Sequence, residues 1–378
     1  MKKILLSLIL LFSGFTFALQ AQENTPQNPV YYGEASSVEY VTSMMSRPGD
    51  LVAPDNTPRE AKDKRSIANQ IVMGQDPQTE DDYFVRYRSE SEQSVNRAPA
   101  SLVFDTYTSN SQPTDPSLAI GPNHVFVVFN TGFMIYDKSG NQLLGETSPN
   151  PAIFPNGGCC DLTVSYDNAA DRWVVTFLST TAGAQIAVSD GSNPLTSNWF
   201  VYTISAVSDY QKLSVWSDGY YITENTSGSN KVWALERSAM LAGSPGAQIL
   251  GFNLPGLVTR GFFSPQVLNV TNNNLPAAGG ATVVYMQDDA WSGVSSDHIK
   301  LWTVDVDWAN TGNSTISSAQ QITVTPFISV FDNGSFSNLT QPGGGSGIDA
   351  LQATIMNQAQ FRKLSLIHIS EPTRRTPI

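Results

Sequence analysis

Residues 113–148 read PTDPSLAIGPNHVFVVFNTGFMIYDKSGNQLLGETS, and this stretch decides the fold. It contains four short apolar runs, which are separated by turn residues of the Pro-Asn, Thr-Gly and Ser-Gly-Asn types. Short apolar runs between such turns predict antiparallel strands. The stretch therefore predicts one four-stranded unit, which has two apolar faces and cannot bury both of them by itself.

The same order of four runs recurs three more times along the chain. The first apolar residues of the units are Leu118, Leu162, Leu213 and Val267, so the spacings are 44, 51 and 54 residues. Four strands per repeat at about this period are typical of a β-propeller, whereas a β-sandwich has no reason to repeat one order. We therefore predict an all-β protein, a β-propeller with four-stranded antiparallel blades over residues 101–363.

The end of the chain predicts an incomplete ring. Residues 346–363 read SGIDALQATIMNQAQFRK and predict the start of a fifth blade. Residues 364–378 read LSLIHISEPTRRTPI and resemble the translation of a sequencing adapter, so we expect a non-native tail on a truncated gene. Four blades and a partial fifth would leave an open arc with exposed edges, and we expect six or seven blades in the full-length protein.

The first 100 residues predict export and an arm. Residues 1–21 have two lysines, a short apolar run and small residues at the end, which is typical of a secretory signal peptide. No window predicts a membrane span. Residues 22–100 are polar and predict a poorly ordered arm, in which 38–45 and 64–72 are candidates for short helices.

The chain is acidic. Its formal net charge is −12, and without the signal peptide and the tail it has 17 basic and 32 acidic residues, a net charge of about −15. Such a chain repels nucleic acid and anionic membrane surfaces. We expect an extracellular glycan or protein as its partner, and no nucleic acid.

Both cysteines of the chain are adjacent, Cys159 and Cys160. This excludes a disulfide framework. A vicinal disulfide and a pair of buried thiols both stay open, and we expect the thiols, because a disulfide between neighbours closes no useful loop. No second pair of cysteines or histidines has the spacing of a zinc site.

Several motifs resemble a family of secreted bacterial β-propeller proteins. These motifs are GPNH and DKSGN at 121–141, YDNAADRW at 166–173, SDGYY at 217–221 and DALQATIMNQAQFR at 349–362. The resemblance covers residues 102–363 and implies a propeller that is secreted, or held at the cell surface, by a Gram-negative bacterium. Similar proteins of the Bacteroidetes often carry a sorting domain for type IX secretion. The family's activity is largely uncharacterised, so the resemblance implies architecture and location more than chemistry.

Four aspartates are the candidate site residues. Asp115, Asp161, Asp167 and Asp218 recur near the starts or ends of the first strands of the units. Aspartates at such places commonly accept backbone N–H bonds in turns, which is the role that we expect. A sharper hypothesis places several of them at one mouth of a central channel, where their oxygens would bind a ligand or Ca²⁺. No contiguous calcium loop supports the metal, so we expect no cofactor.

We predict a non-enzymatic binding module. The alternative is a sialidase-like glycoside hydrolase or lyase, which needs two carboxylates at the channel mouth and an arginine beside them for an acidic sugar. The blades contain few arginines, namely Arg172, Arg237, Arg260 and Arg362, and no Phe-Arg-Ile-Pro motif. Two carboxylates that share one face beside an arginine would favour the enzyme.

Overall fold

The computed structural model describes residues 25–55, 102–106, 114–179, 183–207, 210–224, 231–259 and 264–327, with 329, 343–344, 355 and 357–363. This part of the chain is built from β-strands, and its two α-helices, α4 (Pro149–Ala152) and α5 (Arg237–Leu241), are short. None of its helices has the length and hydrophobicity to cross a membrane. The prediction of an all-β protein is confirmed. The predicted signal peptide and the tail after Lys363 lie outside the described residues.

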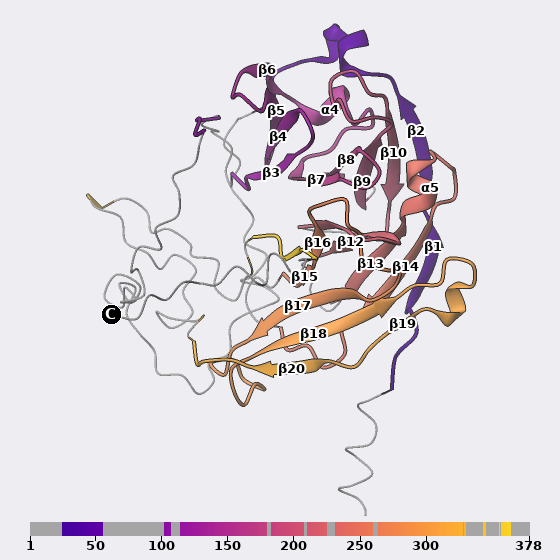
Figure 1. Ribbon diagram of the computed structural model, residues 1–378, viewed down its shortest axis with the longest axis vertical. Helices are drawn as coiled ribbons and strands as arrows, with labels where there is room; N and C mark the ends of the chain where they lie inside the picture. The colour runs from indigo at the N-terminus through magenta and orange to yellow at the C-terminus, as the bar shows by residue number, and fades with distance from the viewer. Residues whose placement is uncertain are drawn as a thin grey trace, which may run out of the picture.

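Four antiparallel sheets follow one another along the described chain (Figure 1). Sheet 1 contains β3 (Ser117–Ile120), β4 (His124–Phe129), β5 (Gly132–Asp137) and β6 (Gln142–Thr147). Sheet 2 contains β7 (Cys160–Asp167), β8 (Arg172–Ser179), β9 (Gly183–Ser189), β10 (Trp199–Ile204) and β2 (Ser37–Val41). Sheet 3 contains β11 (Lys212–Val215), β12 (Gly219–Thr223), β13 (Lys231–Glu236), β14 (Gln248–Asn253) and β1 (Tyr31–Glu34). Sheet 4 contains β15 (Gln266–Val267), β17 (Ala281–Gln287), β18 (His298–Asp305), β19 (Thr315–Ile316) and β20 (Gln320–Thr323).

In sheets 1 to 3, the four strands of each repeated unit pair in chain order, and β2 and β1 add a fifth strand to sheets 2 and 3. In sheet 4, both β19 and β20 pair with β18. The first strands of successive sheets lie next to one another, because β3 contacts β7, β7 contacts β11, and β11 contacts β15. The sheets therefore stack face to face in chain order.

This stacking explains why the strands are apolar on both sides. Trp173 and Val174 are neighbours on β8, yet Trp173 lies in the core between sheets 1 and 2 and Val174 in the core between sheets 2 and 3. Trp302 belongs to the core between sheets 3 and 4. Because neighbouring residues of a strand point to opposite faces, a sheet packed on both sides needs a continuous apolar run.

A second feature is the N-terminal strap, which we define as residues 27–54. It runs along the outer edges of the sheets in the reverse of chain order (Figure 1, indigo). Gln27 exchanges two backbone hydrogen bonds of 2.8 Å with Ile316 of sheet 4. Strand β1 then pairs with β14 of sheet 3, and β2 pairs with β10 of sheet 2. Finally, the carbonyl of Val52 accepts a hydrogen bond from the backbone N–H of Ser148, at the end of sheet 1.

The prediction of a poorly ordered arm is therefore wrong for residues 25–55. Met44 is fully buried in the core between sheets 1 and 2. The candidate helix at 38–45 is wrong too, because its first half forms β2 and only Met44–Ser46 forms a turn of 3-10 helix. The outer edge of β10 has backbone groups that no other strand of its own unit pairs with. Pairing of β2 with this edge overrides the amphipathic pattern that predicted a helix. Two further 3-10 turns cover Pro48–Asp50 and Thr311–Asn313.

A short segment of the predicted fifth unit lies against the first strands. Strand β21 (Gln360–Phe361) pairs in parallel with β16 (Asn269–Val270). The side chain of Gln358 donates hydrogen bonds to the carbonyl of Leu213, at 2.6 Å, and to the hydroxyl of Ser165, at 3.1 Å. This segment therefore connects the inner ends of sheets 2, 3 and 4.

Candidate functional site

The four candidate aspartates separate into two groups. Asp115 and Asp161 line one cavity of about 630 Å³ at the first strands of the sheets. Asp167 and Asp218 lie elsewhere, in contacts between sheets. Of the four candidates, the structure brings Asp115 and Asp161 together at one cavity and places Asp167 and Asp218 away from it.

Asp167 is a structural residue at the junction of sheets 2 and 3. Its carboxylate is fully buried and forms an ion pair with Arg237, whose Nε and Nη2 atoms donate hydrogen bonds of 2.6 and 2.9 Å. The Tyr220 hydroxyl donates a third bond of 3.0 Å, and the N–H of Ala170 donates a fourth of 3.2 Å. Each carboxylate oxygen thus has protein donors, which leaves this group no role at a ligand site.

Asp218 has a similar role between sheets 3 and 4. Its carboxylate accepts hydrogen bonds from the N–H of Gly279, at 2.6 Å, and from the hydroxyl of Tyr221, at 3.1 Å. Its carbonyl accepts a bond of 2.8 Å from the Trp308 indole. Burial raises the pKa of the Asp218 carboxyl, and these two hydrogen bonds to its oxygens lower it again. Asp218 thus accepts a backbone N–H bond, as expected, but the donor lies 61 residues along the chain and not in its own turn.

The cavity is built from equivalent positions of successive units. Ser117, Asp161, Lys212 and Gln266 each stand directly before the first apolar residue of a unit, and all four line the cavity. The sheets stack in chain order with their first strands adjacent, so these positions converge. Five amide side chains contribute to the lining: Gln211, Gln266, Asn357, Gln358 and Gln360.

The backbone is unusual at three residues of the cavity. Asp115, Asp161 and Tyr210 have φ angles of 40°, 58° and 48°, in the left-handed region. Among the non-glycine residues that the structure describes, only Asp171 shares this property. Aspartate tolerates this region, but a bulky residue such as tyrosine adopts it rarely. Unfavourable backbone conformations of this kind cluster at binding and catalytic sites.

Three charged side chains share the cavity. Burial lowers the pKa of the Lys212 ammonium to about 8, although the neighbouring Asp115 and Asp161 carboxylates counteract this shift. Burial raises the pKa of Asp115, and the charge of Lys212 opposes that shift. The Lys212 Nζ atom lies 3.6 Å from the centre of the Tyr210 ring. Burial and the two carboxylates also raise the pKa of the Tyr210 hydroxyl, so these four side chains form one coupled electrostatic group.

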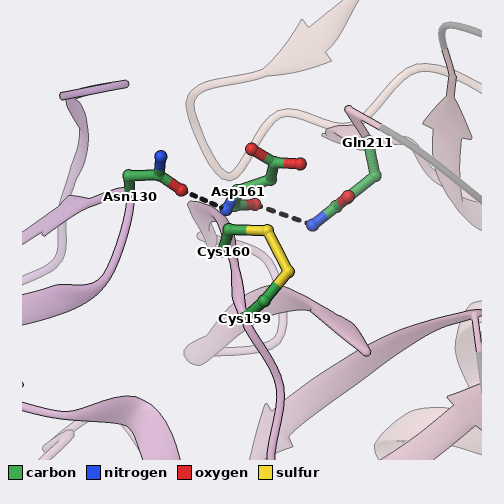
Figure 2. Close-up of a disulfide and its surroundings, with 5 residues drawn as sticks. All are labelled: Asn130, Cys159, Cys160, Asp161 and Gln211. Atoms are coloured by element: carbon green, nitrogen blue, oxygen red, sulfur yellow. Dashed lines mark hydrogen bonds between the residues drawn. A yellow bond between two sulfur atoms is a disulfide. The ribbon is translucent and has the colours of Figure 1, made fainter. Parts of the chain in front are cut away.

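The two cysteines form a vicinal disulfide directly before Asp161 (Figure 2). The expectation of two buried thiols is wrong, since both residues are only half-buried at the start of β7. On the far side of the disulfide, Gly158 passes so close to the Phe177 ring that any side chain there would collide with it. The start of β7 is therefore tightly constrained in covalent structure and in packing.

Two hydrogen bonds fix the backbone of Asp161 on both sides. Its N–H donates to the Asn130 Oδ1 atom at 2.8 Å, and its carbonyl accepts from the Gln211 Nε2 atom at 2.7 Å. Figure 2 shows that the carboxylate extends away from the disulfide and takes no part in these two bonds. The side chains of Asn130 and Gln211, which flank sheets 1 and 3, thus hold the backbone that carries this carboxylate at the cavity.

A separate cluster of acids lies in the hairpin between β17 and β18. The carboxylates of Asp288, Asp289 and Asp297 offer oxygen atoms within 4.8 Å of one another, a spacing that suits a hard cation. Backbone N–H groups already bind two of these acids: Ala290 and Ser329 donate to Asp288, and Phe327 donates to Asp297. The cluster lies apart from the cavity and includes none of the predicted aspartates.

Neither arginine nor histidine occurs among the described residues that line the cavity. Arg237 is held by Asp167, and Arg172 donates to the carbonyls of Ala170 and Asp171. Arg362 is exposed, and Arg260 lies outside the described residues. The arrangement that would favour a sialidase-like enzyme, two carboxylates beside an arginine, is therefore incomplete at this cavity.

Sequence reasoning missed Lys212, Tyr210 and the glutamines. These are ordinary residue types without a recognisable motif, so composition and spacing gave them no weight. One signal was present, because the position before the first apolar residue is polar in all four units. Comparisons with known proteins add no further residue: no protein-family model matches the sequence, and neither does any curated protein. The functional conclusion therefore rests on the geometry of the cavity.

Proposed function

We propose that the chain contains four consecutive blades of a β-propeller that is secreted, or held at the cell surface, by a Gram-negative bacterium. The regular spacing of the four units supports the propeller, and so does the stacking of the sheets along their first strands. In a propeller, first strands surround a central channel, and equivalent positions of the blades meet at its mouth. The resemblance to secreted bacterial propellers supports the location.

We further propose that the protein is a binding module whose ligand, an extracellular glycan or protein, occupies the cavity. The observation that carries this proposal is the convergence of Ser117, Asp161, Lys212 and Gln266 from four units on one cavity. Its volume of about 630 Å³ lies in the usual range for ligand sites. Amides, carboxylates and an ammonium group provide the directional hydrogen bonds that give such a site specificity.

The experiment that tests this proposal fills the cavity. Leu118 and Ile120 lie on the same face of β3 and are similarly exposed, at 56% and 52%, but only Leu118 lines the cavity. The protein is screened on a glycan array and a peptide array, once as wild type and once as each variant. We expect Leu118→Trp to lose the ligands that the wild type binds and Ile120→Trp to retain them. Binding that survives Leu118→Trp would move the ligand site away from the cavity.

One observation favours a second function, that of a glycoside hydrolase or lyase. Two carboxylates share the cavity, and burial raises the pKa of one of them, Asp115, as a general acid requires. This function predicts release of reducing sugar from a polysaccharide and loss of turnover in both Asp115→Asn and Asp161→Asn. Binding without turnover by the wild type would exclude it for that polysaccharide.

A further inference from the structure

One amine in the cavity has neither an ion-pair nor a hydrogen-bond partner within the described chain, the side chain of Lys212. This residue begins β11, where pairing with Thr223 of β12 fixes its backbone. Its Nζ atom lies 3.6 Å from the centre of the Tyr210 ring. The atom is accessible from the cavity, unlike the enclosed amide oxygens of Gln211 and Gln266. Lys212 therefore presents an unengaged amino group to a molecule that enters the cavity.

The surroundings of this amine favour its neutral form. Part of the cavity lining is apolar and cannot hydrogen-bond a charged group, namely Leu118, Leu162 and Leu213. Burial lowers the pKa of Lys212 to about 8, and the charges of Asp115 and Asp161 offset this shift only in part. The third titratable neighbour, the Tyr210 hydroxyl, stays protonated at neutral pH, because its pKa is raised. At pH 7, roughly one Lys212 side chain in ten is therefore neutral, whereas an ordinary lysine is almost wholly charged.

A neutral lysine in an enclosed site is a nucleophile. Lysines that are desolvated in this way attack carbonyl compounds and form imines with them. The reaction moves protons between nitrogen and oxygen, and a carboxyl group in the same site can exchange them. Burial raises the pKa of Asp115, so this carboxyl keeps its proton to a higher pH than an ordinary aspartate does. The cavity thus combines an accessible amine, a group that exchanges protons and space for a small molecule.

We propose that Lys212 captures an aldehyde or a ketone in the cavity as an imine. The neutral amine attacks the carbonyl carbon, a C–N bond forms, and the electron pair of the C=O bond passes to the oxygen. The nitrogen lone pair then expels this oxygen as water. Over the whole step the nitrogen gives up two protons and the oxygen takes up two, which the carboxyl groups of Asp115 and Asp161 exchange. One amine and one carbonyl compound give one imine and one water, so no oxidant or reductant is consumed.

This inference goes beyond the proposed function, because it assigns covalent chemistry to one side chain and requires neither a glycan nor a protein ligand. The two meet in one class of molecule, since the open-chain form of a reducing sugar is itself an aldehyde. The cavity volume of about 630 Å³ leaves room for such a molecule beside the amine.

The test measures reductive trapping of glyceraldehyde, a small aldehyde, by the whole protein at neutral pH. Sodium cyanoborohydride reduces each imine to a stable secondary amine, and peptide mass spectrometry identifies the modified lysines. We expect Lys212 to be modified at least roughly tenfold faster than the exposed Lys138, because far more of it is neutral at this pH. In concentrated urea this preference is expected to disappear, because unfolding removes the surroundings that desolvate Lys212.

Two variants and a second reagent connect the reaction to the cavity and to imine chemistry. Leu118→Trp fills part of the cavity and is expected to slow trapping at Lys212 severalfold. Ile120→Trp, at a similarly exposed position that does not line the cavity, is expected to leave the rate unchanged. Acetylation by a water-soluble ester is measured in parallel, because it reports a neutral amine without requiring an imine. We expect both reagents to prefer Lys212 over Lys138.

The possible results separate this inference from the proposed function. Equal trapping at Lys212 and Lys138 in the folded protein would overturn it, and so would fast acetylation of Lys212 without trapping of glyceraldehyde. A preference for Lys212 that survives in urea or in Leu118→Trp would move the reaction out of the cavity and overturn the inference as well. None of these results decides the proposed function, which depends on ligand binding to the arrays. Preferred trapping at Lys212 that is lost in urea and slowed in Leu118→Trp supports the inference.

Discussion

Strand β7 has an aspartate at each end, and the two have opposite roles. Asp167, at its end, has no exposed surface and accepts hydrogen bonds from Arg237, Tyr220 and the backbone. Asp161, near its start, lines a cavity, and its backbone is held while its carboxylate extends away from the disulfide (Figure 2). The same residue type on the same strand thus serves the fold at one end and a ligand site at the other. The neighbours that other sheets bring to each end decide the role.

The largest loss in the free energy of unfolding is expected at the Asp167 end of β7. Arg237→Met leaves the Asp167 carboxylate buried without its cation, and such a loss destabilises a protein by about 3–5 kcal/mol. Chemical denaturation measures this as a loss in the free energy of unfolding. Arg362→Met, at an exposed position, is the control and is expected to have almost no effect. A loss under about 1 kcal/mol in Arg237→Met would mean that the junction does not hold sheets 2 and 3 together.

A slightly smaller effect is expected between the two ends of β7, where the strap closes the core. Met44 packs in the same core as Val164 and Tyr166 of this strand, and its side chain is fully buried. Met44→Ala creates a cavity and is expected to cost about 2–4 kcal/mol in the free energy of unfolding. The neighbouring Met45 is 56% exposed, so Met45→Ala is a matched control. Equal effects of the two substitutions would show that the strap is not part of the core.

The cavity beside the other end of β7 is expected to lose the Asp115 carboxylate without loss of stability. Burial raises the pKa of Asp115 in the folded protein, so the folded state binds its proton more tightly than the unfolded state does. Stability from this group is therefore lost as the pH rises above the ordinary value of 3.8. Asp115→Asn removes the carboxyl group that causes this loss. We therefore expect the free energy of unfolding at neutral pH to stay unchanged or to rise by less than about 1 kcal/mol. Thermal unfolding of the variant at acidic and neutral pH tests this, and strong destabilisation would give Asp115 a structural role like that of Asp167.

The smallest effect is expected in the titration of the Lys212 ammonium group. The pKa of Lys212 is lowered to about 8, so between about 8 and the ordinary value of 10.5 the folded protein binds fewer protons than the unfolded chain. Stability from this group is present above the upper value and is lost as the pH falls through about 8. The rate of amine labelling at Lys212 is expected to show a midpoint near pH 8, with the exposed Lys138 labelled in parallel as a reference. A midpoint at or above 10 would show that the cavity does not desolvate the lysine.

The strands of the four units were predictable because their signals are local. Each apolar run lies between turn residues, and each predicted unit forms one four-strand series in sheets 1 to 3. Sheet 4 departs from this order, because β15 has only two residues and both β19 and β20 pair with β18. The strap was not predictable in this way. Strands β1 and β2 pair with β14 and β10, which lie far away in the sequence, and their own residues carry no strong strand pattern.

The candidate site was predictable in part, and for a similar reason. Asp115 and Asp161 were recognised from their position at the start of a unit, which places them at the cavity. The same rule selected Asp167 and Asp218, whose partners Arg237 and Gly279 come from other parts of the chain. The cysteines also differed from expectation, because Cys159 and Cys160 are bonded to each other and are only half-buried.

One measurement tests the contrast between the two ends of β7 most directly. The affinity of Asp161→Asn for the strongest ligand found on the arrays is measured together with its free energy of unfolding, with Asp171→Asn as the control. Both positions have a left-handed backbone that asparagine tolerates. We predict that Asp161→Asn weakens binding at least roughly tenfold without loss of stability, and that Asp171→Asn changes neither quantity. Unchanged affinity in Asp161→Asn, or a loss of stability as large as that of Arg237→Met, would contradict a binding role for the cavity end.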